Sequence, residues 1–294
     1  MDRKRFLKTL AALPLAGAAV RLADLNQLAK ELTPSVTMPV LFLGHGSPMN
    51  AIEENEFVSG FRQVATTIPK PAAILCISAH WETRGTFVTA MAHPQTIHDF
   101  GGFPKALFDV QYPAPGSPWL AGETQKLIKS VNVQPDMSWG LDHGAWSVIK
   151  HLYPKADVPV IQMSIDYSKD AQYHYDLGKQ LAALRNKGVL IIGSGNIVHN
   201  LGLVDWKNIR TDNFAFDWAL EARQKVNKLI LNGDHKQLIN FKSLGKEVLK
   251  AVPSPEHYLP LIYTLALKTE KEKVSLFNDK AVGGSLSMTS VKIG

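Results

Sequence analysis

The chain has 294 residues, of which 45% are hydrophobic and 20% charged, a composition typical of a globular protein large enough to bury a sizeable core. Its formal net charge is +6, but residues 1–30 hold six basic residues against two acidic ones, and the remainder has no Lys/Arg cluster with interleaved aromatics, which argues against a nucleic-acid partner. A single cysteine, Cys76, excludes a disulfide within the chain.

The first 30 residues resemble a twin-arginine export signal in which Lys4 replaces the second arginine. The basic start Arg3-Lys4-Arg5 is followed by a mildly apolar stretch at 9–20, which contains the small residues 16–18 suited to cleavage. That stretch is too short to span a bilayer as a helix, so we expect no stable membrane insertion. We predict a signal region at 1–30 and a periplasmic location. The alternative is an amphipathic N-terminal helix on a cytoplasmic protein.

Residues 38–294 have the pattern of one catalytic domain. Apolar, β-branched runs typical of strands occur at 39–43, 73–78, 86–90, 158–163 and 189–193, and residues 286–293 alternate like a strand, which we expect to close the sheet. Helical patterns occur at 56–67, 118–130, 144–151, 169–185 and 212–231, and Ser254-Pro255 fits the N-cap and first turn of another helix. This alternation predicts a single α/β domain with a central, mostly parallel sheet and helices on both faces.

Three of the predicted strands run into a histidine flanked by small residues. His45 follows the run at 39–43, His80 follows the run at 73–78, and His199 follows the glycine-rich end of the run at 189–193. Ligands of open α/β sheets bind outside the carboxyl ends of the strands, and neutral imidazole is a common ligand of iron and zinc. We therefore expect a metal site at that edge, although each histidine alone also fits a turn residue bonded to the backbone.

Two further histidines and one loop add to this pattern. His257 lies near the start of the predicted last helix, and His143 leads into the helix at 144–151, where we expect Asp142 to orient its ring. The long loop between 90 and 118 contains four prolines together with His98, Phe100 and Phe103. Loops of this length in compact domains commonly form lids or pocket walls.

Taken together, eight short motifs are similar to the DOPA-type branch of the class III extradiol ring-cleavage dioxygenases. The resemblance covers residues 38–294 in order and excludes the signal-like start. It lies in Gly-His-Gly-Ser-Pro-Met-Asn (44–50), Ser-Ala-His-Trp (78–81), Ile-His-Asp-Phe-Gly-Gly-Phe-Pro (97–104), Tyr-Pro-Ala-Pro-Gly (112–116), Leu-Asp-His-Gly (141–144), Gly-Ser-Gly-Asn-Ile-Val-His-Asn (193–200), Pro-Glu-His-Tyr-Leu-Pro (255–260) and Gly-Ser-Leu-Ser-Met (284–288).

The resemblance implies a site around a non-haem metal. His45, His80 and His257 would bind the metal, with His199 at or next to it. The resemblance also implies Fe²⁺ for catalysis. Class III enzymes at large resemble a two-histidine, one-carboxylate site, whereas this chain offers His257 beside Glu256, so an all-histidine set fits as well. Such a set also suits Zn²⁺ in the isolated protein.

The implied reaction joins O₂ to a small aromatic diol such as DOPA and opens its ring. His143 and His199 would transfer protons, because a histidine with a pKa near neutrality suits both directions of transfer. Phe100 and Phe103 would supply apolar surface for the aromatic ring, and His98 would bond a ring substituent. Two alternatives stay open: a zinc hydrolase that uses the same histidines to activate water, and a non-enzymatic binding module.

Overall fold

The structure is a computed structural model that describes residues 37–294, so the predicted signal region at 1–30 lies outside the described residues. The strands are β1 (Val40–Gly44), β2 (Ala73–Thr83), β3 (Thr86–Thr89), β4 (Val133–Asp136), β5 (Val160–Asp166), β6 (Val189–Gly195), β7 (Val274–Phe277), β8 (Ala281–Val282), β9 (Leu286–Ser287) and β10 (Ser290–Ile293). The α-helices are α3 (Glu56–Thr66), α4 (Lys105–Phe108), α5 (Pro118–Leu127), α6 (His143–Leu152), α7 (Ala171–Gln180), α8 (Ala182–Arg185), α9 (Asp217–Asn232), α10 (His235–Ile239), α11 (Lys246–Ala251) and α12 (Leu259–Leu265). Short 3₁₀ turns are η1 (Pro48–Ala51), η2 (Leu201–Leu203) and η3 (Phe241–Ser243).

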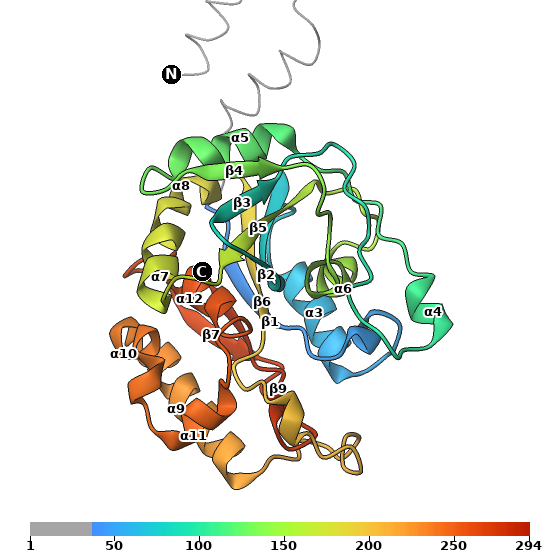
Figure 1. Cartoon of the computed structure of the whole chain (residues 1–294), viewed down its shortest axis with the longest axis vertical. Coiled ribbons are helices and arrows are strands. Elements are labelled where there is room, and N and C mark those ends of the chain that lie inside the picture. Colours follow the sequence, from blue (N-terminus) through green and yellow to red (C-terminus); the bar gives the residue numbers. More distant parts are fainter. Residues whose placement is uncertain (1–36) are drawn as a thin grey trace, which may run out of the picture. The chain divides into compact units, whose positions relative to one another are not determined.

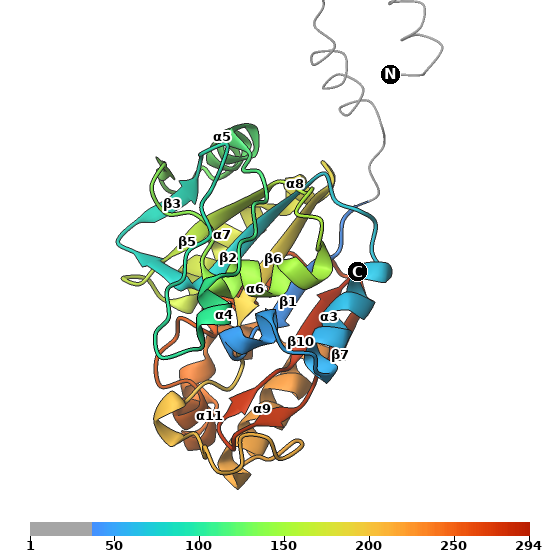
Figure 2. The ribbon, with the colours of Figure 1, turned by 90° about the vertical axis from the view of Figure 1, so that its right-hand side faces the viewer.

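Within residues 37–294, eight strands form one sheet in the order β4-β3-β5-β2-β6-β1-β10-β7. The central strands β5, β2, β6 and β1 are mutually parallel, and β3 pairs in parallel with β4. Antiparallel pairing occurs between β3 and β5 and where β10 and β7 extend the sheet beyond β1, as Figure 2 shows. The predicted mostly parallel α/β sheet is confirmed. The strand predicted at 286–293 is instead divided into β9, which pairs with β8 in a separate sheet, and β10, which lies between β1 and β7, so that β7 rather than the last strand forms this edge.

Helices cover both faces of the sheet because the central strands are apolar on both faces. Alternate residues of β1 point to opposite cores: Val40 and Phe42 join one buried cluster, and Leu41 and Leu43 join the other. The first cluster includes residues of α7, α9 and α12, and the second includes residues of α3 and α6. Figure 1 shows α3 and α6 on one side of the sheet and α7 and α12 on the other.

The structure corrects several predicted boundaries. The helix predicted at 169–185 is divided into α7 and α8, because the chain tightens at Leu181, whose N–H bonds the carbonyl of Gly178, three residues back. The helix predicted at 212–231 begins only at Asp217, since Asn213 has a φ of +51°, which a right-handed helix does not accommodate. β4, β7, α10 and α11 were not predicted.

The last predicted helix begins later than its sequence signals indicate. Ser254 does not cap it: the Ser254 hydroxyl donates to Glu256, and residues 255–258 form a turn. Helix α12 starts at Leu259, and Pro260, rather than Pro255, occupies the first turn. His257 therefore lies in a turn ahead of the helix, close to the edge of the sheet.

The sheet sets the position of the predicted site. Because β1, β2 and β6 are adjacent and parallel, their carboxyl ends meet at one edge. β2 runs on to Thr83, beyond the predicted end at 78, with a shift of register against β5 between Ile77 and Glu82. This irregular segment carries His80. Among the described residues, no helix is long and apolar enough to cross a membrane.

Candidate active site

Three histidines from separate parts of the chain meet at this edge of the sheet. His45 follows β1, His80 lies in the irregular end of β2, and His257 lies in the turn before α12. Their ring centroids are 5.0 to 5.2 Å apart in every pairing, and one ligand nitrogen from each lies within 4.8 Å of the others. The structure thus brings together three of the four histidines predicted to bind a metal.

Hydrogen bonds fix which nitrogen of His45 and of His257 faces the centre. The Ser194 hydroxyl donates its only proton to the carbonyl of Gly144 at 2.5 Å, so it accepts from the Nδ1–H of His45 at 2.9 Å. The Glu256 carboxylate accepts from the Nδ1–H of His257 at 3.0 Å. Each of these two rings therefore keeps the lone pair of its Nε2 free.

Burial keeps these rings uncharged. Removal from water lowers the pKa of His45 and His80 well below the usual value, and neighbouring imidazoles lower it further. Burial also lowers the pKa of His257, against the opposing effect of Glu256. Although burial alone would raise the pKa of Glu256, hydrogen bonds from His257 and Ser254 help to hold it at about 2, so this carboxylate is ionised.

The donor set fits a divalent transition metal. The Nε2 atoms of His45 and His80 lie only 3.2 Å apart, and neutral nitrogens with facing lone pairs repel unless a proton or a cation lies between them. A proton shared between these two rings would leave Nε2 of His257 without a partner, whereas a metal ion bonds all three rings at once. Imidazole nitrogens oriented by a serine and a carboxylate are the ligands that iron and zinc use in proteins.

His143 adjoins these three rings. It is the first residue of α6, and its ring centroid lies 3.8 Å from that of His80. The structure corrects the expectation that Asp142 orients this ring. Asp142 instead caps α6 by accepting from the backbone N–H of Ala145, whereas Asp99 accepts from Nδ1 of His143 at 2.9 Å. His143 thus presents Nε2 as its free nitrogen.

His199 lies behind His257 rather than among the three converging rings. The two rings are stacked, with centroids 3.5 Å apart and planes inclined by 12°. Burial and the nearby His257 lower the pKa of His199 to about 3, so its ring is neutral. A nitrogen of His199 falls into a second candidate metal group with Glu256 and His257, but that group shares only His257 with the first.

The residues predicted to contact the substrate belong to the long loop before α5. The Phe100 ring meets the ring of His143 edge-on, with centroids 5.5 Å apart, and Phe103 packs edge-on against Phe100 at the same distance. His98 donates from Nε2 to the carbonyl of Val110 at 2.9 Å, so only its Nδ1 is free for a ligand. Phe100 therefore stands next to the histidines, with Phe103 behind it.

Two glycines permit this crowding. A Cβ on Gly144 would overlap the Ser78 hydroxyl and lie 2.7 Å from Cδ2 of His80, and a Cβ on Gly195 would overlap the carbonyl oxygen of His257. Only a residue without a side chain allows α6 to approach β2, and the turn of His257 to approach β6, so closely. The small residues seen beside the histidines in the sequence thus serve the packing of the site.

Sequence reasoning missed two polar partners of the site, Asp99 and Ser194. Both residues lie inside the motifs at 97–104 and 193–200, and their place in these motifs is the only feature of the sequence that indicates a role in the site. Their pairings are not local, because Asp99 lies 44 residues from His143 and Ser194 lies 149 residues from His45.

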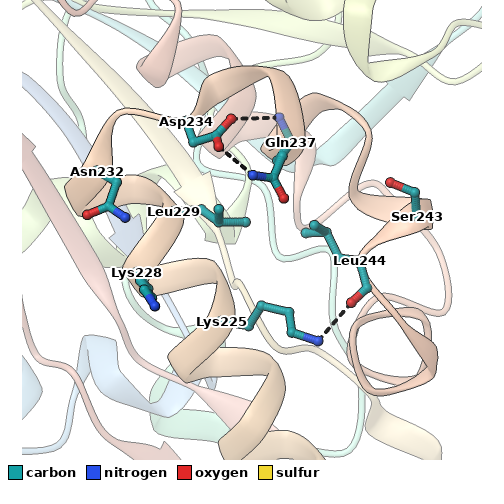
Figure 3. Close-up of a pocket in the computed structure, with 8 residues that line it drawn as sticks. All are labelled: Lys225, Lys228, Leu229, Asn232, Asp234, Gln237, Ser243 and Leu244. Carbon is teal, nitrogen blue, oxygen red and sulfur yellow. Dashed lines mark hydrogen bonds between the residues drawn. The ribbon is translucent and has the colours of Figure 1, made fainter.

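A pocket of about 410 Å³ lies elsewhere, between α9 and the segment of α10 and η3 (Figure 3). Some of its polar groups pair with one another: Lys225 donates to the carbonyl of Leu244, and Gln237 donates to Asp234. None of the predicted site residues lines it. We therefore place the candidate active site at the histidines and not in this pocket.

The chain is similar to proteins of known family and structure over most of its length. Residues 38–279 match the family described as the catalytic LigB subunit of aromatic ring-opening dioxygenase. A 4,5-DOPA dioxygenase extradiol of Escherichia coli is 46% identical over 275 residues, which cover 92% of this chain and all of that protein. A protein of the same name from Beta vulgaris is 38% identical over 268 residues, covering 85% and 94% of the two chains. A crystal structure of an uncharacterized E. coli K12 protein superposes with a TM-score of 0.76 at 40% identity, covering 87% of this chain and all of that one.

Proposed function

Because the chain belongs to the family of the catalytic LigB subunit of aromatic ring-opening dioxygenases, we propose that the ring it opens is that of a catechol such as DOPA. The chain is an extradiol ring-opening dioxygenase that depends on a non-haem metal. Its family decides between the dioxygenase and the two alternatives left open by the sequence, the zinc hydrolase and the binding module. The names of the E. coli and Beta vulgaris relatives support DOPA as the substrate.

One structural observation carries the proposal: three neutral imidazoles converge at a site that the aromatic ring of Phe100 adjoins. We assign His45, His80 and His257 as the metal ligands, each through Nε2, and Fe²⁺ as the metal. Bound there, Fe²⁺ would hold the catechol and O₂ and pass electrons between them, chemistry that Zn²⁺ cannot supply. Phe100 offers the edge of an apolar ring beside His143, which suits a flat aromatic substrate.

His143 is assigned the proton transfers. Asp99 holds its Nδ1–H, so its Nε2 lone pair is free to accept a proton from a catechol hydroxyl and to return it later. We place His199 beside the metal, where its ring covers one face of His257 and contributes a further neutral nitrogen. His98 is assigned to a substituent of the catechol ring through its free Nδ1.

Oxygen uptake tests this function. Anaerobically iron-loaded protein should consume O₂ when L-DOPA is added and develop a new visible absorbance, whereas the zinc-loaded protein should do neither. His45→Ala should abolish uptake, and His93→Ala, which changes an exposed histidine of the same chain, should leave it unchanged. A failure of the iron-loaded protein to consume O₂ with either L-DOPA or catechol would refute the substrate proposal.

The location is a separate proposal, supported by the basic and apolar pattern of residues 1–30. We propose that this segment directs export of the protein to the periplasm. When cells that produce the full chain are fractionated, the protein should be periplasmic, and replacement of both Arg3 and Lys4 by Gln should retain it in the cytoplasm. Equal distribution of the two proteins would contradict export.

A further inference from the structure

Asp99 touches two of the site's histidines with one carboxylate. Its Oδ2 accepts from Nδ1 of His143 at 2.9 Å and lies 3.6 Å from Nδ1 of His80. The second distance is too long for a hydrogen bond but short enough for a strong electrostatic effect in a partly buried site. A single side chain from the long loop therefore faces both the assigned proton-transfer residue and an assigned metal ligand.

The other oxygen of Asp99 holds the start of α6. Its Oδ1 accepts from the backbone N–H of His143 at 2.8 Å, one of the donors that the first turn of a helix leaves without a partner. Each carboxylate oxygen thus accepts from a different N–H of the same residue, Oδ2 from the ring and Oδ1 from the backbone. Hydrogen bonds of this kind favour the charged form of a carboxylate.

We propose that Asp99 is a positioning residue that sets the tautomers of His143 and His80, so that both rings turn Nε2 toward the metal and the substrate. With Asp99 accepting, the proton of His143 is fixed on Nδ1. The same negative charge favours the proton of His80 on Nδ1, which leaves its Nε2 lone pair opposite Nε2 of His45. Loss of this charge should thus weaken metal binding as well as proton transfer.

If Asp99 only capped α6, Asp99→Asn would leave the tautomer of His143 unchanged, whereas the positioning role predicts that the tautomer is reversed. The amide oxygen can replace Oδ1 as the acceptor of the backbone N–H, and that arrangement is favoured because a buried N–H without an acceptor destabilises the folded state. The amide NH₂ then faces Nδ1 of His143 and, being a donor only, forces the proton of that ring onto Nε2. The cap survives in this variant, but the tautomer is reversed.

The test uses full-length, zinc-loaded protein, which is diamagnetic and suits ¹⁵N spectroscopy of the imidazole rings. The signals of His143 are identified by their loss in His143→Ala. In the unchanged protein Nδ1 should carry the proton, in Asp99→Asn the proton should move to Nε2, and in Asp99→Ala the single Nδ1–H form should be lost. The dissociation constant for Zn²⁺ should rise about tenfold in both Asp99 variants. Asp109→Asn is the matched control and should change neither quantity, because within residues 37–294 the side chain of Asp109 pairs only with the exposed Lys105 in the same loop region.

Part of this inference rests on the proposed function, namely the effect on turnover. With L-DOPA, Asp99→Asn should lower kcat at least about 10²-fold with little change in KM, as expected when a proton acceptor holds the wrong tautomer. The nitrogen spectra and Zn²⁺ affinity need no turnover, so they decide the role of Asp99 even if no catechol is consumed. Unchanged ring spectra and unchanged Zn²⁺ affinity in both Asp99 variants would overturn the proposal.

Discussion

Gly144→Ala should damage the histidine site through packing alone, without removing any polar group. Gly144 is the second residue of α6 and lies against the irregular end of β2. The added Cβ would overlap the hydroxyl of Ser78 and approach Cδ2 of His80 to 2.7 Å, well inside van der Waals contact. Both β2 residues must move, and the Ser78 hydroxyl would lose its 2.7 Å bond to Asp142.

The expected cost follows from three effects. Overpacking of a rigid interior costs about 1–3 kcal/mol, and the loss of a buried hydrogen bond adds about 1 kcal/mol. Alanine favours a helix over glycine by about 1 kcal/mol, which offsets part of that cost. The free energy of unfolding should therefore fall by about 1–3 kcal/mol. Displacement of His80 should also weaken Zn²⁺ binding at least about tenfold.

Gly122→Ala provides the matched control. Gly122 lies within α5, and a Cβ there meets no atom of the described residues within 4 Å. This change should raise the free energy of unfolding by about 0.5–1 kcal/mol and leave Zn²⁺ affinity unchanged. Urea unfolding and competition with a chelator measure the two quantities. If Gly144→Ala behaved like Gly122→Ala in both, the argument from close approach would be refuted.

Three further predictions concern single side chains. Ser194→Ala removes the acceptor of the His45 Nδ1–H, so Zn²⁺ affinity should fall about tenfold in a chelator competition; an unchanged affinity would contradict the assigned tautomer. Phe100→Ala should raise KM for L-DOPA with a smaller change in kcat, because the ring supplies contact surface rather than protons; steady-state oxygen uptake will separate the two. Glu272 pairs with the buried Arg185, and although burial opposes it, this pairing lowers the pKa of Glu272. The stabilisation that this ion pair contributes is therefore present above about pH 4.5 and is lost as the pH falls through the lower, folded-state pKa of Glu272. Glu272→Gln should lower the free energy of unfolding at pH 7 and should also make that free energy fall less between pH 7 and acid. Urea unfolding at several pH values measures both.

The sequence predicts the parts of this fold and site that depend on local pattern. Apolar runs locate the central strands, and the histidines at their ends can be placed at one edge because parallel strands share a direction. Long-range partners are not encoded locally: nothing beside His143 in the chain indicates Asp99, and the adjacent Asp142 is the more obvious partner. Asp142 is unavailable to that ring because it accepts from Ser78 and Gln162 and caps α6.

Helix boundaries are also predicted wrongly where two local sequence signals for a helix start lie close together. Ser254 and Pro255 have the residue types of a helix start, but Pro260 satisfies the same preference five residues later, and the helix begins beside it. The difference matters for the site, since His257 then belongs to a turn whose carbonyl accepts from the backbone N–H of Asn196 at 2.9 Å. That contact, made across the edge of the sheet, aims His257 at His45.

The three assigned ligand histidines differ from a two-histidine, one-carboxylate set in where the negative charge lies. All three rings are neutral, yet His257 bonds the ionised Glu256, and His80 faces the ionised Asp99. Two carboxylates thus stand one imidazole away from the centre. They would offset the charge of a divalent ion without occupying a coordination position, and the hydrogen bond to Glu256 makes His257 a stronger donor. An all-histidine set in this chain therefore does not imply a site with an uncompensated double positive charge.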